Sequence, residues 1–546
     1  MRFGLNLWGL NPYFLQDKEA FLERITKAGF RYLEPVLLLD EMPELKSHIW
    51  LPEDFKENGP LLQKYNVSIE SIHVFSPDIY DDAERIIPLA KEYGIKQVVL
   101  PCPKFEAKEA YEGLAPYIGE AGDLFAEAGI DLVLHNGRDE SKAQIDGISA
   151  FEWMIKNAGD NVYMEPDVGW LLYGGTDPEE FLWKYAKKIK VLHYKDMKKV
   201  ENGYAETEIG TGEVDNVACF QFARANEIIQ IADQDGSEGD FLEAMERVGG
   251  RLKMWSNARD NSKSILCVMD ITTGEVKELK TFDRVIEAPN WYAKDDDVLF
   301  YNSEGFIYKY RISTGEEEKI ESGICDNCNN DHVLKADGSA IAVSHSPRNS
   351  WMSQVYILPI EGGTPRLVTE NAPSFLHGWS PDGKELAYCA FRDMETNFHV
   401  DIYTISENGG EERQLTQNAG FNDGPEYSPD GEYILFISTR SGLMQNWRMK
   451  RDGSEQTQLT FSERNNWFGH YSPDGKKIVY LSYSKDGLDP NEHLPNMNVS
   501  LSLMDADGDN DHVILEFFGG QGSINVNSWH PDSKKFAFVK YELMHK

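Results

Sequence analysis

YMEPDVGWLLYGGTDPEEFLWKYAKKIKVLHYKD, residues 163–196, contains two short apolar strands separated by an amphipathic helix pattern. The first strand ends near Asp167 and the second at His193, and both residue types bind divalent cations. A strand–helix–strand unit with a right-handed crossover makes its two strands parallel neighbours. Their carboxyl ends then lie side by side. The stretch therefore predicts an Asp and a His at one edge of a parallel sheet, where barrel enzymes assemble metal sites.

The same alternation of apolar runs and helical patterns fills about the first 235 residues. Helical stretches such as KEAFLERITKAG and DDAERIIPLAKEYG place apolar residues at i, i+3 and i+4 and finish at Gly, a usual helix end. Eight strand–helix units over roughly 250 residues predict a (β/α)8 TIM barrel over residues 1–252. The predicted strands are 3–9, 32–37, 67–75, 97–103, 131–137, 162–170, 190–196 and 227–235, and the last helix is 241–252.

Short alternating strands and a repeat replace this pattern beyond residue 262. HGWSPDGKELAYCAF (377–391), GPEYSPDGEYILFIS (424–438) and FGHYSPDGKKIVYLS (468–482) share one frame, a strand, a Pro-Asp-Gly turn and a second strand. Weaker copies begin near residues 289, 332 and 527, at a spacing compatible with propeller blades. Residues 264–282 resemble outer strands without an inner pair. Joining the two ends predicts an all-β propeller of six blades over 264–546, after a linker at 253–263.

The composition argues against two classes of binding partner. The chain has 546 residues and a net charge of −37, which disfavours nucleic acid and anionic membranes because both would repel it. The N-terminus runs straight into a strand, so no signal peptide is expected, and no stretch of about 18 apolar residues predicts a membrane span. Six cysteines are sparse usage, consistent with a reducing compartment. We therefore expect a cytoplasmic protein, whose oligomeric state the sequence leaves open.

The barrel half resembles the sugar phosphate isomerase/epimerase superfamily, also called xylose isomerase-like barrels. The resemblance rests on DVGW at 167–170, HYKD at 193–196, the Gly-x-Gly-x-Val-Asp stretch at 210–215 and LHNGRDE at 134–140. It implies a divalent metal, Mn²⁺ first and Mg²⁺ or Zn²⁺ as alternatives, held by Glu140, Asp167, His193 and Asp233. Such a metal holds two oxygens of a hydroxy-ketone and stabilises the enediolate that forms on proton loss.

Two positions depart from the family pattern. Gly137 replaces the second His of the strand-five motif, and Asp233 replaces the Glu that usually ends strand eight. A carboxylate shortened by one methylene retreats by roughly 1.5 Å, so it still reaches a metal but reaches a substrate proton less easily. A reaction that uses one base, or an elimination, is affected less than a two-base epimerisation.

Further polar residues lie at the predicted strand ends. The candidates for proton transfer are Glu140, Asp233, His73 and Lys195, and those for substrate binding are His135, Asn136 and Glu34. Five of these seven residues have a structural alternative: Glu34 and Lys195 could form buried ion pairs, Glu140 could be a surface acid, and His135 with Asn136 could be a hydrogen-bonded structural pair.

The propeller half resembles Tol-type propellers with repeated WSPDG motifs, and oligogalacturonate lyases less closely. Its Pro-Asp-Gly turns indicate the fold and say almost nothing about chemistry. His332 and His377 occupy one register on the predicted innermost strands, and His470 lies one residue off it. These three histidines are a possible second polar or metal site; the alternative is a water-filled channel lined by ordinary polar groups.

The sequence supports three hypotheses. The first is a metal-dependent isomerase or epimerase that removes a proton next to the carbonyl of a keto-sugar or keto-glycoside, with β-elimination from a 3-keto-glycoside as the close alternative. The second is a glycan- or protein-binding propeller with a barrel that has lost its activity. The third is a propeller lyase with an accessory barrel. The expected ligand of the first is a small sugar or glycoside.

Overall fold

The chain folds into two compact units, Met1–Ala258 and Arg259–Lys546. The computed structural model describes residues 3–105, 107–201, 203–236, 239–256, 262–348, 350–392, 399–417, 419–486 and 488–544. The division falls inside the predicted linker, although the last barrel helix, α11 (Phe241–Ser256), continues four residues beyond its predicted end. Over the described residues, no helix has the length and apolar character needed to cross a membrane.

Eight parallel strands form the closed barrel of the first unit. Two sheets, in the orders β10-β13-β1-β2 and β3-β4-β5-β6-β9, are joined by the bridges Tyr32–Ser68 and Asp167–His193. β2 and β3 count as one strand interrupted by Pro35, whose backbone has no N–H to donate. The predicted TIM barrel is confirmed. Its strands are β1 (Phe3–Asn6), β2 (Phe30–Glu34), β3 (Val36–Leu37), β4 (Ser71–Val74), β5 (Gln97–Pro101), β6 (Asp131–His135), β9 (Val162–Glu165), β10 (Val191–Tyr194) and β13 (Ile229–Ala232).

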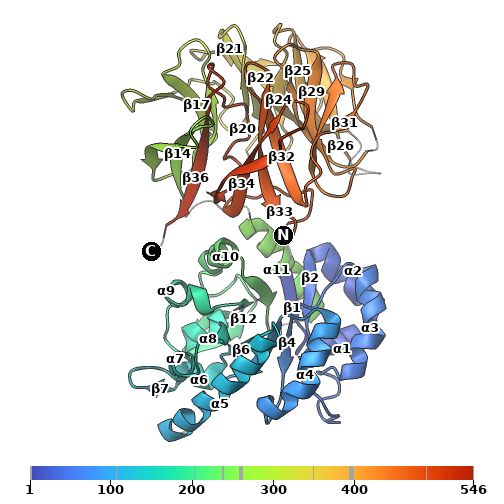
Figure 1. Cartoon of the computed structure of the whole chain (residues 1–546), viewed down its shortest axis with the longest axis vertical. Helices are drawn as coiled ribbons and strands as arrows, with labels where there is room; N and C mark the ends of the chain where they lie inside the picture. The colour runs from blue at the N-terminus through green and yellow to red at the C-terminus, as the bar shows by residue number, and fades with distance from the viewer. Residues whose placement is uncertain are drawn as a thin grey trace. The chain divides into compact units, whose positions relative to one another are not determined.

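Helices surround these strands (Figure 1). Their ends follow the sequence signals: the side chain of Asp17 accepts the N–H of Ala20 at the start of α2, and α2 ends at Gly29, whose φ of 110° is unfavourable for residues with a Cβ. The helices are α1 (Asn11–Gln16), α2 (Lys18–Ala28), α3 (Pro52–Lys64), α4 (Ile79–Tyr93), α5 (Lys108–Glu127), α6 (Arg138–Lys142), α7 (Ala150–Asn157), α8 (Val168–Tyr173), α9 (Pro178–Lys184), the short 3₁₀ helix Ala186–Lys188, α10 (Asn216–Ala225) and α11.

The predicted strand 162–170 is wrong in its second half. β9 ends at Glu165, and α8 begins after Asp167, whose carboxylate accepts the N–H of Trp170 as the helix cap. The apolar run that predicted a long strand is therefore shared between a strand and a buried helix, which periodicity alone cannot separate. Two small hairpins were also not predicted: β7 (Gln144–Ile145) with β8 (Ile148–Ser149), and β11 (Asp196–Val200) with β12 (Gly203–Thr207).

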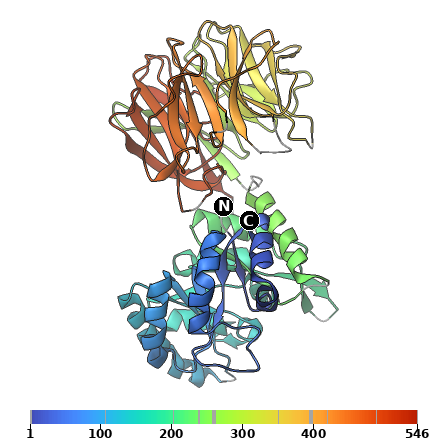
Figure 2. The same ribbon diagram turned by 90° about the vertical axis from the view of Figure 1, so that its right-hand side faces the viewer.

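Six sheets form the propeller, and the predicted six blades are confirmed. Figure 2 shows the propeller strands in colours from green to red. Five sheets use consecutive strands, innermost first: β16 (Glu287–Trp291), β17 (Val298–Ser303), β18 (Phe306–Arg311), β19 (Glu317–Lys319); β20 (Cys328–Leu334), β21 (Ala340–His345), β22 (Gln354–Pro359), β23 (Arg366–Leu367); β24 (Ser374–Trp379), β25 (Glu385–Phe391), β26 (Val400–Ser406), β27 (Arg413–Gln414); β28 (Asn422–Tyr427), β29 (Tyr433–Ser438), β30 (Gln445–Lys450), β31 (Thr457–Gln458); and β32 (Arg464–Tyr471), β33 (Lys477–Ser484), β34 (Met497–Asp505), β35 (His512–Gly519).

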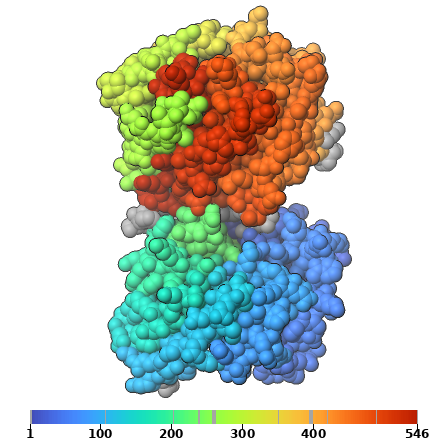
Figure 3. All heavy atoms as spheres, viewed as in Figure 1, coloured from blue at the N-terminus to red at the C-terminus, as the bar shows by residue number. Residues whose placement is uncertain are grey.

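The sixth blade joins the two ends of the propeller sequence. β14 (Ser262–Asp270) pairs with β15 (Val276–Phe282) on one side and with β36 (Lys535–Leu543) on the other. The bridge between Trp529 and Phe536 adds the innermost segment. Figure 3 shows the green and red segments in contact at this closure. The pairing confirms the expected use of residues 264–282 as outer strands of the last blade.

Replacement of Glu317 by Gln is expected to destabilise the first blade in a pH-dependent way. Burial opposes ionisation of Glu317, but contacts from Tyr301, Lys280 (2.9 Å) and Arg284 outweigh it and lower the pKa to about 2. A depressed carboxyl pKa contributes stability at neutral pH that is lost as the pH falls from about 4.5 towards 2. Solvent screening reduces the effect, so we expect about 1–2 kcal/mol at pH 7.

Urea unfolding at pH 7 and at pH 3 measures this loss, with the exposed neighbour Glu318→Gln as the matched control. The difference in unfolding free energy between the Glu317→Gln variant and the parent should shrink at pH 3. An equal loss at both pH values would show that the effect comes from packing and not from the charge of Glu317.

Candidate metal centre in the barrel

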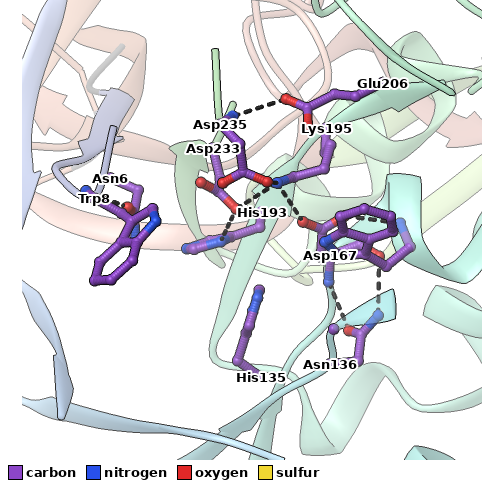
Figure 4. A network of polar contacts seen from close by, with 12 residues as sticks. Asn6, Trp8, His135, Asn136, Asp167, His193, Lys195, Glu206, Asp233 and Asp235 are labelled. Carbon is purple, nitrogen blue, oxygen red and sulfur yellow. Dashed lines mark hydrogen bonds and ion pairs between the residues drawn. The ribbon is translucent and has the colours of Figure 1, made fainter. Parts of the chain in front are cut away.

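Polar side chains from seven of the eight barrel strands gather at the carboxyl ends of those strands. Asn6, Glu34, His73, His135, Glu165 and His193 lie within β1, β2, β4, β6, β9 and β10, and Asp167, Lys195 and Asp233 follow the last residues of β9, β10 and β13. Part of this network is drawn in Figure 4. Because the strands are parallel and closed, residues far apart in sequence meet at one edge.

The first group, here called the imidazole cluster, consists of His73, His135, Glu165 and His193, whose ligand atoms lie within 4.8 Å of one another. Glu165 Oε2 is 2.7 Å from His73 Nε2 and 3.3 Å from His135 Nδ1. Glu165 Oε1 is 3.0 Å from His193 Nε2. Burial disfavours the charged carboxylate, but the imidazoles of His193 and His73 outweigh it and hold the pKa of Glu165 well below its usual range.

The second group, the carboxylate cluster, consists of His135, Asp167, His193 and Asp233, also within 4.8 Å of one another. His193 Nδ1 lies 3.4 Å from Asp233 Oδ2. Burial raises the pKa of Asp167 to about 8, whereas at Asp233 the charges of Lys195 and His193 outweigh burial and lower the pKa far below its usual range. His135 and His193 belong to both clusters, so the two form one continuous polar centre.

Lys195 places a buried ammonium beside the carboxylate cluster. Its Nζ is 3.1 Å from Asp233 Oδ2, 3.0 Å from Asp235 Oδ2 and 3.6 Å from Asp167 Oδ2, and Figure 4 shows it between these acids. Burial opposes its charge, but the surrounding acids outweigh burial and raise the pKa of Lys195 well above its usual range. One fixed positive charge thus faces Asp167, Asp233, Asp235 and the partly buried Glu206, whose pKa burial raises to about 7.

The donor set fits a divalent cation. Asp167 Oδ2 and His193 Nδ1 are buried and have no hydrogen-bond partner among the residues that the structure describes. Their nearest charged neighbours are Lys195 Nζ at 3.6 Å from Asp167 Oδ2 and Asp233 Oδ2 at 3.4 Å from His193 Nδ1, so both atoms keep capacity to bind a ligand. Two carboxylates and two imidazoles carry a charge of −2 when the imidazoles are neutral, which a divalent ion balances.

Three of the four ligands that the family resemblance implied, Asp167, His193 and Asp233, lie together in the carboxylate cluster. Glu140 does not join either cluster, and His135 occupies its place in the set. The reason is local: Glu140 lies in the first turn of α6, and its Oε1 accepts the N–H of Gly137 at 3.1 Å. The carboxylate is occupied as a helix cap in this structure.

Glu34 and Asn136, predicted to bind substrate, both contact residues of the two clusters. Glu34 is fully buried; its carboxylate accepts hydrogen bonds from Asn6 and Ser71 and contacts His193 Nε2 at 2.7 Å. The Asn136 amide donates to the Asp167 carbonyl at 3.2 Å, and its oxygen accepts the Asp167 N–H at 2.8 Å. Asn136 therefore fixes the backbone that carries Asp167. The other candidates, His73, His135 and Lys195, lie in or beside the clusters.

Glu165 is the residue of the imidazole cluster that the sequence reasoning missed. It stands two positions before Asp167, and alternate residues of a strand point to the same side. The same spacing relates His193 to Lys195 and Asp233 to Asp235. Glu165 is a charged residue in a predicted buried strand, and it stands two positions before a predicted ligand. These two facts could have indicated that its side chain lies at the site.

The loop that follows β12 is organised by Asp196. Its carboxylate accepts the N–H groups of Gly210, Gly212 and Val214 at 2.8–3.1 Å. A Cβ on Gly212 would lie 2.3 Å from Asp196 Oδ1, so the loop can close on this carboxylate only with glycine at that position. The Gly-x-Gly-x-Val-Asp stretch therefore holds the backbone that follows Lys195.

The three propeller histidines do not converge on one another in the described part of the chain. His332 is fully buried and neither ring nitrogen has a hydrogen-bond partner among the described residues. His470 pairs with Glu426 at 2.7 Å and contacts the carbonyl of Ile524 at 2.8 Å. Only His377 belongs to a potential metal-binding group, with Cys389 and Asp423.

Two family models match the chain, and they agree with the barrel and the propeller just described. One is described as a xylose isomerase-like TIM barrel and matches residues 22–232. The other is described as the TolB beta propeller domain and matches residues 349–500. The N-terminal unit is therefore similar to xylose isomerase-like TIM barrels over residues 22–232, and the C-terminal unit is similar to TolB-type propellers over residues 349–500.

The following three proteins each cover about half of the chain or less. An uncharacterised protein of Agrobacterium fabrum, Atu1656, is 42% identical over 280 residues, 51% of this chain and 92% of that protein. A solved structure described as "putative TolB from Agrobacterium tumefaciens" is 41% identical and covers 52% of this chain and 99% of its own, with a TM-score of 0.49. Inosose dehydratase of Clostridium botulinum is 23% identical over 242 residues, 40% of this chain and 80% of that enzyme.

Two solved structures are described with bound metals. A xylose isomerase-like barrel protein of Mycobacterium smegmatis in complex with magnesium is 16% identical, covers 46% of this chain and 95% of its own, and has a TM-score of 0.35. The IOLI protein with a bound zinc atom is 17% identical, covers 46% of this chain and 97% of its own, and has a TM-score of 0.35.

Proposed function

We propose that the barrel is a divalent-metal-dependent isomerase or epimerase that removes a proton next to the carbonyl of a keto-sugar or keto-glycoside. The carboxylate cluster at the carboxyl ends of the barrel strands carries this proposal. Its ligand types and its position at the end of a barrel where active sites lie support it. Inosose dehydratase is an enzyme that resembles 40% of this chain, and this similarity adds support.

Asp167, His193, Asp233 and His135 would hold the cation, with Mn²⁺ as the first candidate and Zn²⁺ or Mg²⁺ as alternatives. A bound divalent ion supplies Lewis-acid stabilisation of negative charge on the substrate oxygens. The acidic surroundings, with Asp235 and Glu206 beside the cluster, favour a neutral sugar or glycoside over a sugar phosphate.

The side chains of the centre differ in how far they are exposed to a substrate. Glu34, Glu165, Asp167 and His193 have fully buried side chains, whereas those of His135, Asp233 and His73 are 14%, 10% and 9% exposed. Of these three groups, His73 lies outside the proposed ligand set, and we assign proton removal and return to it. Lys195 keeps its charge and can donate a hydrogen bond to oxygen that becomes negative during the reaction.

β-Elimination from a 3-keto-glycoside is the second candidate. Epimerisation by two acids needs a carboxylate on each side of the sugar, and Glu140, the second acid that the resemblance implied, caps its own helix instead. Elimination requires one base for the carbon acid and a proton donor for the leaving group, which His73 and Lys195 can provide.

Incubation of the full chain with Mn²⁺ and a panel of unphosphorylated keto-sugars and 3-keto-glycosides in deuterium oxide tests the proposal. We expect deuterium at the carbon next to the carbonyl, detected by mass spectrometry, and loss of this exchange after chelation. An isomeric product supports isomerisation, whereas release of the aglycone supports elimination. No exchange in the metal-loaded protein with any member of the panel would contradict the proposal.

A further inference from the structure

The propeller contains a second group of side chains able to bind a metal. His377 on β24, Cys389 on β25 and Asp423 on β28 offer a nitrogen, a sulfur and an oxygen atom within 4.8 Å of one another. His377 Nε2 is 3.1 Å from Asp423 Oδ1. All three residues are less than 9% exposed. The group joins two neighbouring blades, since β24 and β25 belong to one sheet and β28 to the next.

A second buried carboxylate lies beside this group. Asp331 on β20, in the preceding blade, has its Oδ1 3.9 Å from His377 Nε2. Asn525 donates a hydrogen bond of 2.6 Å to the same oxygen and holds it in place. The ring of His377 is stacked on Phe468 at 5.7 Å, which fixes its orientation. The side chains are therefore held by their surroundings before any ligand binds.

Positive charge is scarce around these acids. Across the described residues, the ion pairs of Asp331 and Asp423 are made with His377, and neither acid pairs with a lysine or arginine. His377 faces both buried carboxylates, and the charge of His493 also acts on Asp423. A bound cation would give both carboxylates a direct positively charged partner.

Chemistry by the thiol alone is disfavoured. Cys389 is 3% exposed, and burial raises its pKa well above the usual range, so the free thiol is inert towards substrates and oxidants. It forms no disulfide. A thiol next to an imidazole and a carboxylate can, however, release its proton when the sulfur binds a metal.

We propose that His377, Cys389 and Asp423 bind a zinc ion inside the propeller, with Asp331 as the fourth ligand. The thiolate selects Zn²⁺ over Mn²⁺, Mg²⁺ and Ca²⁺, and four protein ligands without an open position make a structural site. On binding, the thiol proton and the proton on His377 Nε2 pass to solvent as the Zn–S and Zn–N bonds form. The thiolate and the two carboxylates carry three negative charges against the two positive charges of the ion, so the closed site keeps one net negative charge, and it joins three successive blades.

Cobalt substitution in the full chain tests the proposal and separates it from the barrel centre. Co²⁺ bound to a thiolate absorbs in the near ultraviolet by charge transfer from sulfur, whereas neither barrel cluster contains a cysteine. We expect the chelator-treated parent protein to gain this band on addition of Co²⁺. The nearly isosteric Cys389→Ser should lose it, and Asp167→Asn, which alters the barrel cluster, should keep it.

Cys325→Ser is the matched control because Cys325 is also a buried propeller cysteine and lies outside the proposed site. It should keep the band. Zinc content by mass spectrometry should fall by about one ion per chain in Cys389→Ser and in Asp423→Asn, with unchanged circular dichroism. Absence of the band in the parent protein, or its persistence in Cys389→Ser, would overturn the proposal.

Discussion

Asp167→Asn is expected to weaken Mn²⁺ binding by at least about 100-fold, since it replaces a charged ligand by a neutral one without changing side-chain size. Asp167 contributes one of the two carboxylates of the carboxylate cluster, and its Oδ2 is buried without a hydrogen-bond partner among the described residues. Its Oδ1 caps α8, and the Asn oxygen can keep this bond. Calorimetric titration of chelator-treated protein with Mn²⁺ measures the change, and deuterium exchange into substrate should fall in parallel.

Asp235→Asn is the control for this experiment. Asp235 also pairs with Lys195, at 3.0 Å, but its side chain is 47% exposed and it belongs to neither cluster. We expect its Mn²⁺ affinity to stay within about threefold of the parent, a shift of less than about 1 kcal/mol. Equal losses in the two variants would mean that the affinity reflects the overall negative charge of the region. The assignment of Asp167 as a ligand would then fail.

Glu165→Gln is expected to lower the free energy of unfolding of the metal-free barrel by about 3 kcal/mol at pH 7. The fully buried carboxylate contacts the imidazoles of His73, His135 and His193 at 2.7–3.3 Å. It also holds the pKa of His73 and His193 above the usual range despite their burial. Gln can keep one hydrogen bond but removes one of the two buried carboxylates that face His73 and His193, which leaves Glu34 as their shared counter-charge.

Urea unfolding followed by hydrogen exchange in β9 and β10 measures this loss. Glu19→Gln serves as the control, because it removes a surface pair with Lys64 in which both side chains are more than half exposed. Such a pair contributes about 0–1 kcal/mol. If Glu165→Gln were no more destabilising than Glu19→Gln, Glu165 would not be the counter-ion of the imidazole cluster.

The order of elements in both units was predictable because each has a local signal. Helices that start at Asp caps and stop at glycine, as α2 does, and blades built on Pro-Asp-Gly turns need no long-range information. Closure of the sixth blade was also predictable, because 264–282 lacked an inner pair and the C-terminal copy lacked outer strands. The end of β9 was not predictable, because an apolar run fits a buried strand and a buried helix equally well.

The sequence by itself determined that this protein consists of an eight-stranded barrel and a six-bladed propeller, and that Asp167, His193 and Asp233 stand at the strand ends. Only the tertiary structure decided the composition of the centre. It brings His135 and Glu165 next to His193 and turns Glu140 to the cap of its own helix. It also places Cys389 beside His377 and Asp423 in the propeller. The reason is physical: hydrophobic periodicity assigns a residue to a strand and a face, whereas ligand geometry depends on strand register and side-chain hydrogen bonds between segments distant in sequence.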